Sequence, residues 1–301
     1  MRRYTIVPKE SAHLPYFPGP TVRGAVGAAL RKLLCATRKS TCDGCVLQNA
    51  CAYAMLHDGH TPLDRRSGSG AHAPPPVWIR DIDRGGHMPE GRPFRFSFVA
   101  YGPAIRSLPY LDEAVRSAAE RGLGRDRTPF DLASAIDEER SDLGALMESR
   151  IDRWTSALRG SAGRLWIQLA SPVNIRLKGD AWNDPGRPLP SWPERLIGGA
   201  ARRRIALEKR WIRPSADVSV SVPSALRDAE SVELELSSLQ RVTLRRFSST
   251  QRRDVELVGA VGDLQLGGSG ITSALPWIAA AEVLGVGSGT TFGLGRIRVE
   301  A

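Results

Sequence analysis

A glycine-rich segment near the end of the sequence places the strongest constraint on the fold. Five glycines fall between Gly285 and Gly295, and a short strand-like run, Ile297–Val299, follows them. A loop that grips a nucleotide pyrophosphate opens a helix, whose N-terminal N–H groups face the phosphates. Only six residues follow Gly295, so we exclude dinucleotide-binding and P-loop folds. Two interpretations remain: a loop whose backbone approaches a bulky anionic ligand, or a structural turn.

The charge balance points to an acidic partner. The 301 residues carry a formal net charge of +10, and nucleic acid is the commonest partner of so basic a chain. Clusters of basic residues lie in the second half, at Arg202–Arg204, Lys209–Arg210, Arg245–Arg246 and Arg252–Arg253. Because clustering is more informative than total charge, these groups favour nucleic acid over a merely solvated surface.

The sequence shows no sign of membrane insertion or export. No apolar run approaches the roughly 20 residues of a membrane span, and Met1–Tyr4 leads directly into strand-like sequence without a signal-peptide core. We therefore expect a cytoplasmic protein with no membrane partner.

All four cysteines lie within seventeen residues, at Cys35, Cys42, Cys45 and Cys51. In a reducing compartment such a cluster indicates a metal before it indicates disulfides. Four thiolates satisfy tetrahedral zinc and leave no open position for catalysis. We predict a structural zinc; an iron–sulfur cluster and metal-free thiols are the alternatives.

The first half alternates strand and helix signals in the order βαββαβ, which is typical of the ferredoxin-like fold. The predicted elements are a strand at Tyr4–Val7, a helix from an N-cap at Thr21 to about Leu34, strands at Val77–Ile79 and Phe94–Ala100, a helix around Leu111–Ala118 ended by Gly122, and a strand near Pro129–Leu132.

The second half repeats this plan after a helical linker around Leu143–Leu158. The predicted elements are a strand at Leu165–Leu169, a helix from a capping box at Ser191 to Trp211, a strand at Val232–Leu236, two strand-like runs flanking Gly259 and Gly262, a helix at Ser273–Leu284 and the terminal strand.

The predicted fold is therefore α+β, with two tandem ferredoxin-like domains. We place the first domain at residues 1–140, with a cysteine-rich insertion at about 35–76. A helical linker covers 141–162, and the second domain covers 163–301 with the glycine-rich loop at 285–295. Residues 57–76 have the composition of a mobile loop.

One face of the first predicted helix carries a basic pattern. Arg23, Gly27 and Arg31 follow one another at intervals of four, so they share a face opposite the apolar residues. With the small residues Gly24 and Gly27 allowing close approach, this face is either a phosphate platform or an ordinary solvated helix surface.

Several segments resemble the CRISPR-associated endoribonucleases that cut repeat RNA into guide RNAs, a family of the RAMP superfamily with tandem ferredoxin-like domains. The resemblance covers nearly the whole chain. It rests on Phe17–Gly27, the closing run Cys51-Ala52-Tyr53 of the cysteine cluster, Phe98–Ala104, Gly122–Gly124, Ser171–Ile175 and Thr290–Gly295.

The resemblance implies a metal-independent reaction in which a ribose 2′-hydroxyl attacks its own phosphate and leaves a 2′,3′-cyclic phosphate. The expected substrate is a repeat hairpin in precursor RNA. The mature guide RNA would stay bound, beside other RAMP subunits of an effector complex. A non-cleaving RAMP scaffold subunit that only binds the repeat stem-loop is the alternative, and a metal-cluster protein unrelated to RNA is a third hypothesis.

Many relatives place a catalytic histidine in or just after the first helix, and the predicted first helix of this chain contains none. We therefore assign catalysis to arginines, whose planar donors suit phosphate oxygens. Arginines used in this way by some type IV members resemble Arg23 and Arg38; Arg241 is a third candidate. His57, which follows the cysteines, is the alternative proton-transfer group.

Further basic and glycine residues are predicted to contact RNA. The paired arginines would hold a stem by its phosphates, since A-form RNA is read mainly by shape; the alternative is a solvated strand. The predicted RNA-binding residues are Arg31, Lys39, Arg202, Arg203, Arg245, Arg246, Arg252, Arg253, Gly287, Gly289, Thr291, Gly293 and Arg296.

Overall fold

The computed structural model describes residues 1–39, 41–42, 44–58, 74–138, 142–160, 163–175, 192–212, 221–248 and 253–300. The chain divides into two compact units. The first comprises Met1–Arg140, Ala206–Ala216 and Thr291–Gly293, and the second comprises Ser141–Ile205, Asp217–Thr290 and Leu294–Ala301. Among the described residues, no helix has the length and apolar character needed to cross a lipid bilayer.

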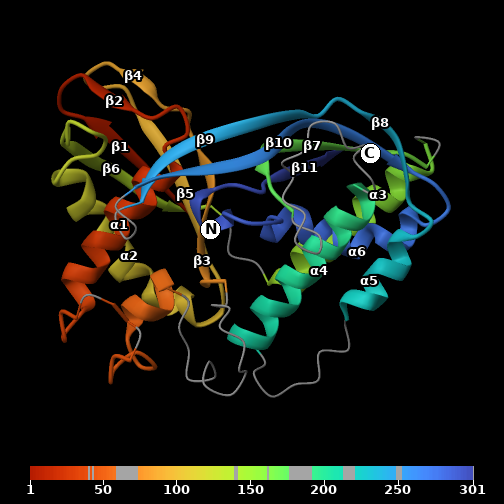
Figure 1. Cartoon of the computed structure of the whole chain (residues 1–301), viewed down its shortest axis with the longest axis horizontal. Coiled ribbons are helices and arrows are strands. Elements are labelled where there is room, and N and C mark those ends of the chain that lie inside the picture. The colour runs from red at the N-terminus through yellow and green to blue at the C-terminus, as the bar shows by residue number, and fades with distance from the viewer. Residues whose placement is uncertain are drawn as a thin grey trace. The chain divides into compact units, whose positions relative to one another are not determined.

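The first unit has a four-stranded antiparallel sheet with two helices on one face (Figure 1). In spatial order the strands are β3 (Val77–Ile82), β5 (Phe94–Ala100), β1 (Arg2–Pro8) and β6 (Phe130–Asp137), and the helices are α1 (Gly19–Leu34) and α2 (Leu108–Glu120). This order and connectivity are those of a ferredoxin-like βαββαβ domain, as predicted.

Alternating side chains of the sheet and the inner faces of both helices form the core of the first unit. Tyr4 and Ile6 of β1 pack with the three phenylalanines of β5, because every second residue of a strand faces the same side. From α1, Val22 and Val26 complete this core. Leu33, near the C-terminal end of α1, lies outside this core and is 47% exposed.

Three local features were not predicted. The helix α1 begins at Gly19 rather than after an N-cap at Thr21, and no side chain caps it. A small ladder joins β2 (Ala12–Leu14) to β4 (Gly86–Met88). A π-helical turn, η1 (Ala54–Asp58), lies within the cysteine-rich insertion. Most of the predicted mobile loop, residues 59–73, lies outside the described residues.

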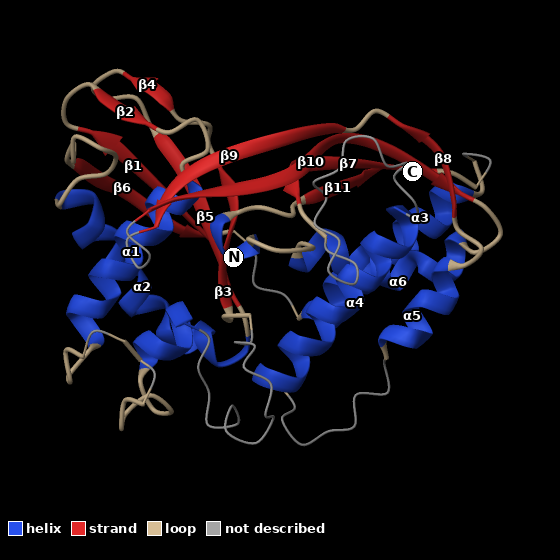
Figure 2. Cartoon of the chain, viewed as in Figure 1, coloured by secondary structure: helices blue, strands red, loops and turns tan. Residues whose placement is uncertain are grey.

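The second unit repeats the arrangement (Figure 2). Its sheet has the spatial order β11 (Ile297–Glu300), β7 (Leu165–Val173), β10 (Arg253–Gly267) and β8 (Glu233–Ser237), with α4 (Trp192–Trp211) and α6 (Ile271–Leu284) against one face. In chain order these elements again form βαββαβ, which confirms the prediction of tandem ferredoxin-like folds. The proposed capping residue Ser191 lies outside the described residues.

A two-stranded ribbon extends this second sheet. The strand β9 (Gln240–Ser248) pairs with the first half of β10, from Arg253 opposite Ser248 to Val261 opposite Gln240. Pairing between β10 and β7 begins only at Ala260. The two strand-like runs predicted around Gly259 and Gly262 are thus one long strand, β10.

Two further helices belong to the second unit. The helix α3 (Leu143–Leu158) is capped by the Asp142 side chain and packs against α6, where Arg150 Nε donates to Glu282 Oε2 at 2.6 Å. The helix α5 (Val222–Ala229), which was not predicted, also packs on α6. The predicted linker helix therefore forms part of the packing of the second unit.

The glycine-rich loop is a tightly closed turn. The main-chain N–H of Val286 donates to Gly295 O at 2.8 Å, and that of Ser288 donates to Asn174 O at 2.8 Å. Gly287 and Gly295 have φ of +79° and +74°, and a Cβ on either would collide with a main-chain carbonyl. The closed turn therefore explains why glycine is needed at these two positions. The approach of RNA to this loop stays a prediction.

Candidate functional site

Arg23 is a buried cation on α1. Its residue surface is 8% exposed, its Nη2 donates to the carbonyl oxygen of His57 at 2.5 Å, and its Cζ lies 5.8 Å from the ring centroid of Phe292. Burial lowers the pKa of Arg23 to about 10, against the opposing effect of the negative charge on Asp58. The guanidinium is therefore still protonated at neutral pH. It forms no ion pair with a carboxylate among the described residues.

Two stacked rings cover the helix face that carries Arg23. Tyr53 and His57 lie 5.4 Å apart with an interplanar angle of 11°, and a Cβ on Gly27 would collide with the His57 ring. At the other end of the stack, Arg31 Cζ lies 5.8 Å from the Tyr53 ring centroid. The interpretation of a solvated face is wrong at Arg23 and Gly27, because η1 packs onto them. The contact of this face with phosphate stays a prediction.

His57 is part of this packed layer and not an exposed loop residue. Its side chain is 25% exposed, and its Nδ1 lies 3.1 Å from Asp58 Oδ1. Burial lowers the pKa of His57, with Arg23 acting in the same direction and Asp58 opposing it. The imidazole is therefore mainly neutral at pH 7, with one nitrogen held by a carboxylate and the other against Gly27.

A basic groove lies at the C-terminal end of α1. It has a volume of about 430 Å³ and is lined by Ala28, Arg31, Lys32, Cys35 and Arg38. Arg38 is exposed and has a left-handed backbone with φ of +53°. The structure thus brings the predicted residues Arg31 and Arg38 to one groove, and the predicted RNA-binding residue Lys39 follows directly, also exposed.

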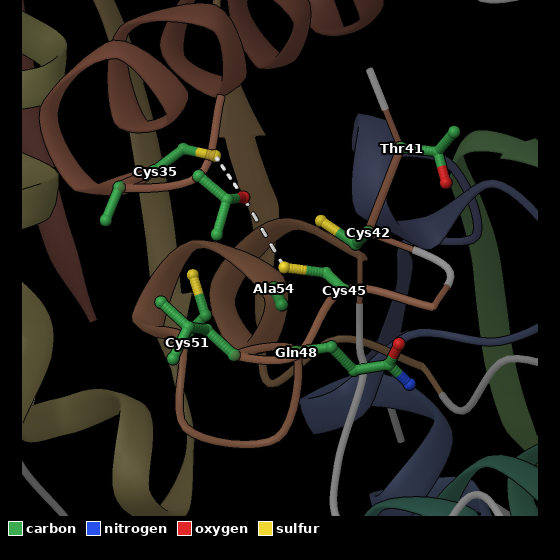
Figure 3. Close-up of a pocket in the computed structure, with 10 residues that line it drawn as sticks. Cys35, Thr41, Cys42, Cys45, Gln48, Cys51 and Ala54 are labelled. Atoms are coloured by element: carbon green, nitrogen blue, oxygen red, sulfur yellow. Dashed lines mark hydrogen bonds between the residues drawn. The ribbon is translucent and has the colours of Figure 1, made fainter. Parts of the chain in front are cut away.

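The four cysteines line one small cavity (Figure 3). The Thr37 hydroxyl lies 3.4 Å from Cys45 Sγ and 3.9 Å from Cys35 Sγ. Its hydrogen bond lowers the pKa of Cys45, whereas burial raises the pKa of Cys42 to about 12. All four thiols are free of disulfides. In the described part of the chain, no three potential metal ligands come close enough together to hold an ion.

The candidate residues of the second unit lie mainly on the ribbon. Arg241 and Arg245 are exposed on β9, and Arg245 Nε lies 3.4 Å from Glu256 Oε1. Arg253 is exposed at the start of β10. Arg246 belongs to β9, but its side chain is not described, and Arg252 lies outside the described residues. Two strands therefore present the described arginines to solvent.

Arg203 departs from the prediction. Within the basic run of α4, Arg202 is exposed, but Arg203 is only 8% exposed and its Nε donates to Leu284 O at 2.7 Å. Burial lowers the pKa of Arg203 to about 9. The side chain satisfies the last carbonyl of α6, so it is a structural cap and not an exposed phosphate ligand.

The loop residues Gly287, Gly289, Thr291, Gly293 and Arg296 vary in exposure. Gly293 is buried, and a Cβ there would lie 3.2 Å from the Ile79 side chain. Arg296 is half-buried, and its main-chain N–H donates to Ser171 Oγ at 2.9 Å. Their contact with RNA stays a prediction.

Four neighbours of the candidate residues were not singled out from the sequence: Lys32, Tyr53, Asp58 and Phe292. Tyr53 and His57 are four residues apart, which is the spacing of neighbours on one helix face. The stacking of these two rings could therefore have been predicted from their spacing in the sequence. The approach of Phe292 to Arg23 has no local signal, because the two residues lie in distant parts of the chain.

The fold and the site define the class first: a tandem ferredoxin-like protein with a buried arginine and a basic groove along its first helix. The family model for the CRISPR-associated endoribonuclease Cas6 matches residues 128–297, and a model described as an N-terminal domain matches residues 1–164. The chain belongs to the Cas6 endoribonuclease family, which confirms the resemblance found in the sequence.

Solved structures agree with this fold. A product complex of Cas6 from Thermus thermophilus has a TM-score of 0.58 at 13% identity, covering 100% of this chain and 99% of the other. A second Cas6 product complex has a TM-score of 0.52 at 21% identity, covering 100% of both chains. A Cas6-related protein from Pyrococcus furiosus has a TM-score of 0.51 at 12% identity, with 100% and 98% covered. The comparison with curated proteins found no match.

Proposed function

We propose that this chain cuts the repeat hairpins of precursor CRISPR RNA through Arg23, which neutralises the phosphate as the upstream 2′-hydroxyl attacks it. The observation that carries this assignment is the state of the Arg23 guanidinium. It is buried, protonated, joined to one carbonyl, and without an ion pair among the described residues. A cation held in a site of low polarity is most effective on charge that develops in a transition state.

The reaction needs no metal in this proposal. The 2′-hydroxyl gives its proton to water as its oxygen forms a bond to phosphorus, the bond from phosphorus to the 5′-oxygen breaks, and that oxygen takes a proton from water. The products carry a 2′,3′-cyclic phosphate and a 5′-hydroxyl. Arg38, in the groove beyond Arg23 on the same unit, would hold a neighbouring phosphate. Arg241 on β9 remains a third catalytic candidate. Family membership favours cleavage over the non-cleaving scaffold alternative.

The RNA stem would be held by the exposed basic residues. Arg202, Arg241, Arg245 and Arg253 are accessible to phosphates, whereas the burial of Arg203 speaks against it as an RNA ligand. Solved relatives include Cas6 product complexes and a complex of Cas6 with a reverse transcriptase, Cas1 and Cas2. These relatives support a protein that retains its product and works with other CRISPR proteins.

Structural zinc on Cys35, Cys42, Cys45 and Cys51 belongs to the same proposal. The four side chains line one cavity, and soft thiolates are the donors that zinc prefers. Because no three of the described ligands are close enough to hold an ion as they stand, zinc binding would require the thiols to draw together. The ion would tie the insertion together away from the reacting phosphate. Because four thiolates complete the coordination of zinc, the proposal gives it no part in the chemistry.

His57 is a second candidate for proton transfer. The contact of its Nδ1 with Asp58 favours it, because a carboxylate orients the imidazole of many catalytic histidines. Its Nε2 lies against Gly27, and Arg23 is itself buried beneath η1, so a reacting phosphate would reach either group only if η1 moved. Arg23 is favoured over His57 because its permanent positive charge can offset the charge that develops on the phosphate.

The experiment is single-turnover cleavage of hairpin repeat RNAs in excess chelator, followed by analysis of the RNA ends. We expect cleavage without free divalent ions, a 2′,3′-cyclic phosphate, and complete loss of cutting when the 2′-hydroxyl upstream of the cut is removed. Arg23→Ala should slow cutting far more than it weakens binding.

Arg116→Ala is the matched control, because Arg116 lies exposed on α2 of the same unit. It should leave the rate unchanged. Products with a 3′-hydroxyl, or a strict requirement for a divalent ion, would contradict the mechanism. A variant His57→Ala that is inactive while Arg23→Ala remains active would transfer the catalytic role to His57.

A further inference from the structure

The groove at the C-terminal end of α1 has the composition of an anion site. Three of its five lining residues, Arg31, Lys32 and Arg38, are cations, and no carboxylate lines it. Its volume of about 430 Å³ lies within the range of ordinary ligand pockets, about 300 to 1,000 Å³. Lys32 has no role in the assignments above.

These three cations are not neutralised within the described part of the chain. None of them forms an ion pair with a described carboxylate, in contrast to Lys9, whose Nζ lies 2.8 Å from Asp131 Oδ1. Like charges that line one groove repel one another. The partial negative charge at the end of a helix offsets only part of that repulsion.

The backbone also holds one of these cations in an unfavourable conformation. Arg38 has φ of +53°, which costs a non-glycine residue roughly 1 kcal/mol or more. A strained backbone conformation of this kind is retained where the surrounding structure fixes it. In this chain the strained residue is Arg38, one of the three cations that line the groove.

We infer that this groove binds one phosphodiester of the RNA strand, with the Lys32 ammonium and the Arg38 guanidinium as its donors. The inference rests on the proposed function, because the RNA is the repeat substrate or its product. Lys32 supplies a point charge, whereas Arg38 supplies planar donors that suit two phosphate oxygens. Arg31 remains at the wall of the groove, with its guanidinium over the Tyr53 ring.

A rival explanation is that the cations balance thiolates. Cys35 lines both this groove and the cysteine cavity, and a metal held by four thiolates would carry net negative charge. The two explanations differ in what Lys32→Ala changes. A phosphate site predicts weaker RNA binding, whereas charge balance predicts weaker metal retention.

The test measures binding of an RNA hairpin made uncleavable by a single 2′-deoxy substitution. Lys32→Ala should weaken binding about three- to tenfold and reduce the slope of log affinity against log salt by about 0.7, the value for one single-strand phosphate. Lys32→Arg should restore most of the affinity. Lys9→Ala, which removes the same charge from the same unit, should change neither quantity.

Single neutral methylphosphonate linkages then locate the contact. At one position, the neutral linkage should weaken RNA binding to the wild-type protein but should not weaken it further in the Lys32→Ala variant. The Arg38→Ala variant should likewise lose its sensitivity to the linkage at that position. Equal sensitivity of wild type and Lys32→Ala at every linkage would overturn the inference, as would lost metal with unchanged RNA affinity. This binding test uses an uncleavable RNA, so its result does not depend on catalysis. If the unmodified repeat RNA were not cleaved, the proposed function would be refuted, but the binding result could still be interpreted.

Discussion

Arg23 and Arg203 are buried arginines on corresponding helices of the two βαββαβ folds, and they differ in what holds them. Arg23 on α1 and Arg203 on α4 are both 8% exposed, and burial lowers both pKa values. Arg203 donates to Leu284 O, the last carbonyl of α6. Arg23 donates to His57 O, a carbonyl of the insertion, and faces the Phe292 ring.

This difference is the basis on which we propose a structural role for Arg203 and a catalytic role for Arg23. The carbonyl bonded to Arg203 is the last of the helix α6, and such terminal carbonyls need a hydrogen-bond donor from outside the helix. The carbonyl bonded to Arg23 lies on a π-helical turn, a structure found frequently at functional sites. Burial and charge alone would rank the two arginines equally, so the partner decides the assignment.

The largest expected effect is that alanine at Arg23 reduces the cleavage rate, whereas alanine at Arg203 reduces the stability of the fold. Arg23→Ala should slow single-turnover cleavage by about 100- to 1,000-fold, the size expected for loss of one transition-state donor. Arg203→Ala should lower the free energy of unfolding by about 1–3 kcal/mol, because the Leu284 carbonyl loses its donor in a buried position. Rate and denaturant measurements on both variants check this.

The reversed pattern would break the comparison. If Arg203→Ala abolished cleavage in a stably folded protein, while Arg23→Ala chiefly affected stability, the functional arginine would lie in the second unit. Arg23→Lys serves as a further test, since it keeps the charge but loses the planar donors.

A second prediction addresses the fit between η1 and α1. Gly27→Ala places a Cβ into the His57 ring, so it should cost about 1–3 kcal/mol through overpacking and should slow cleavage by displacing the partner of Arg23. Gly24→Ala is the matched control on the same helix, because a Cβ there meets no atom within 4 Å. It should stabilise the helix by about 0.5–1 kcal/mol. Equal effects of the two substitutions would contradict the packing argument.

A third prediction concerns removal of the metal. If zinc is bound to the cysteines, extraction by a strong chelator should speed amide hydrogen exchange in α1 and η1 and leave α4 and α6 unchanged. The reason is that the insertion, not the second unit, carries the cysteines. Zinc analysis before and after treatment provides the control, and faster exchange confined to α6 would argue against this coupling.

The smallest expected effect is a pH dependence at His57. Burial lowers its pKa below the ordinary value of 6.5, so the unfolded chain binds the proton more readily than the folded chain. Stability from this group is present above pH 6.5 and is lost as the pH falls toward the lowered value. In the His57→Gln variant, the free energy of unfolding should depend less on pH between pH 7.5 and about 5.5. A stability that rises as the pH falls would show the opposite shift.

The sequence predicted the repeated βαββαβ order because alternation and helical spacing are local signals. The catalytic roles of Arg23 and Arg38 stay predictions. The sequence did not predict that η1 covers the face of Arg23 and Gly27, because that packing depends on an insertion without clear periodicity. For the same reason Arg202 and Arg203 looked equivalent: exposure within a basic run depends on how the helix is oriented against α6.

The assignment of Thr291–Gly293 to the first unit has a consequence for biosynthesis. The ribosome makes α1 early and Phe292 far later, so a nascent chain holds Arg23 without its aromatic neighbour for most of translation. Cutting activity that depends on this ring would therefore appear only after Phe292 has left the ribosome. Products terminated before Phe292 would lack this neighbour of Arg23.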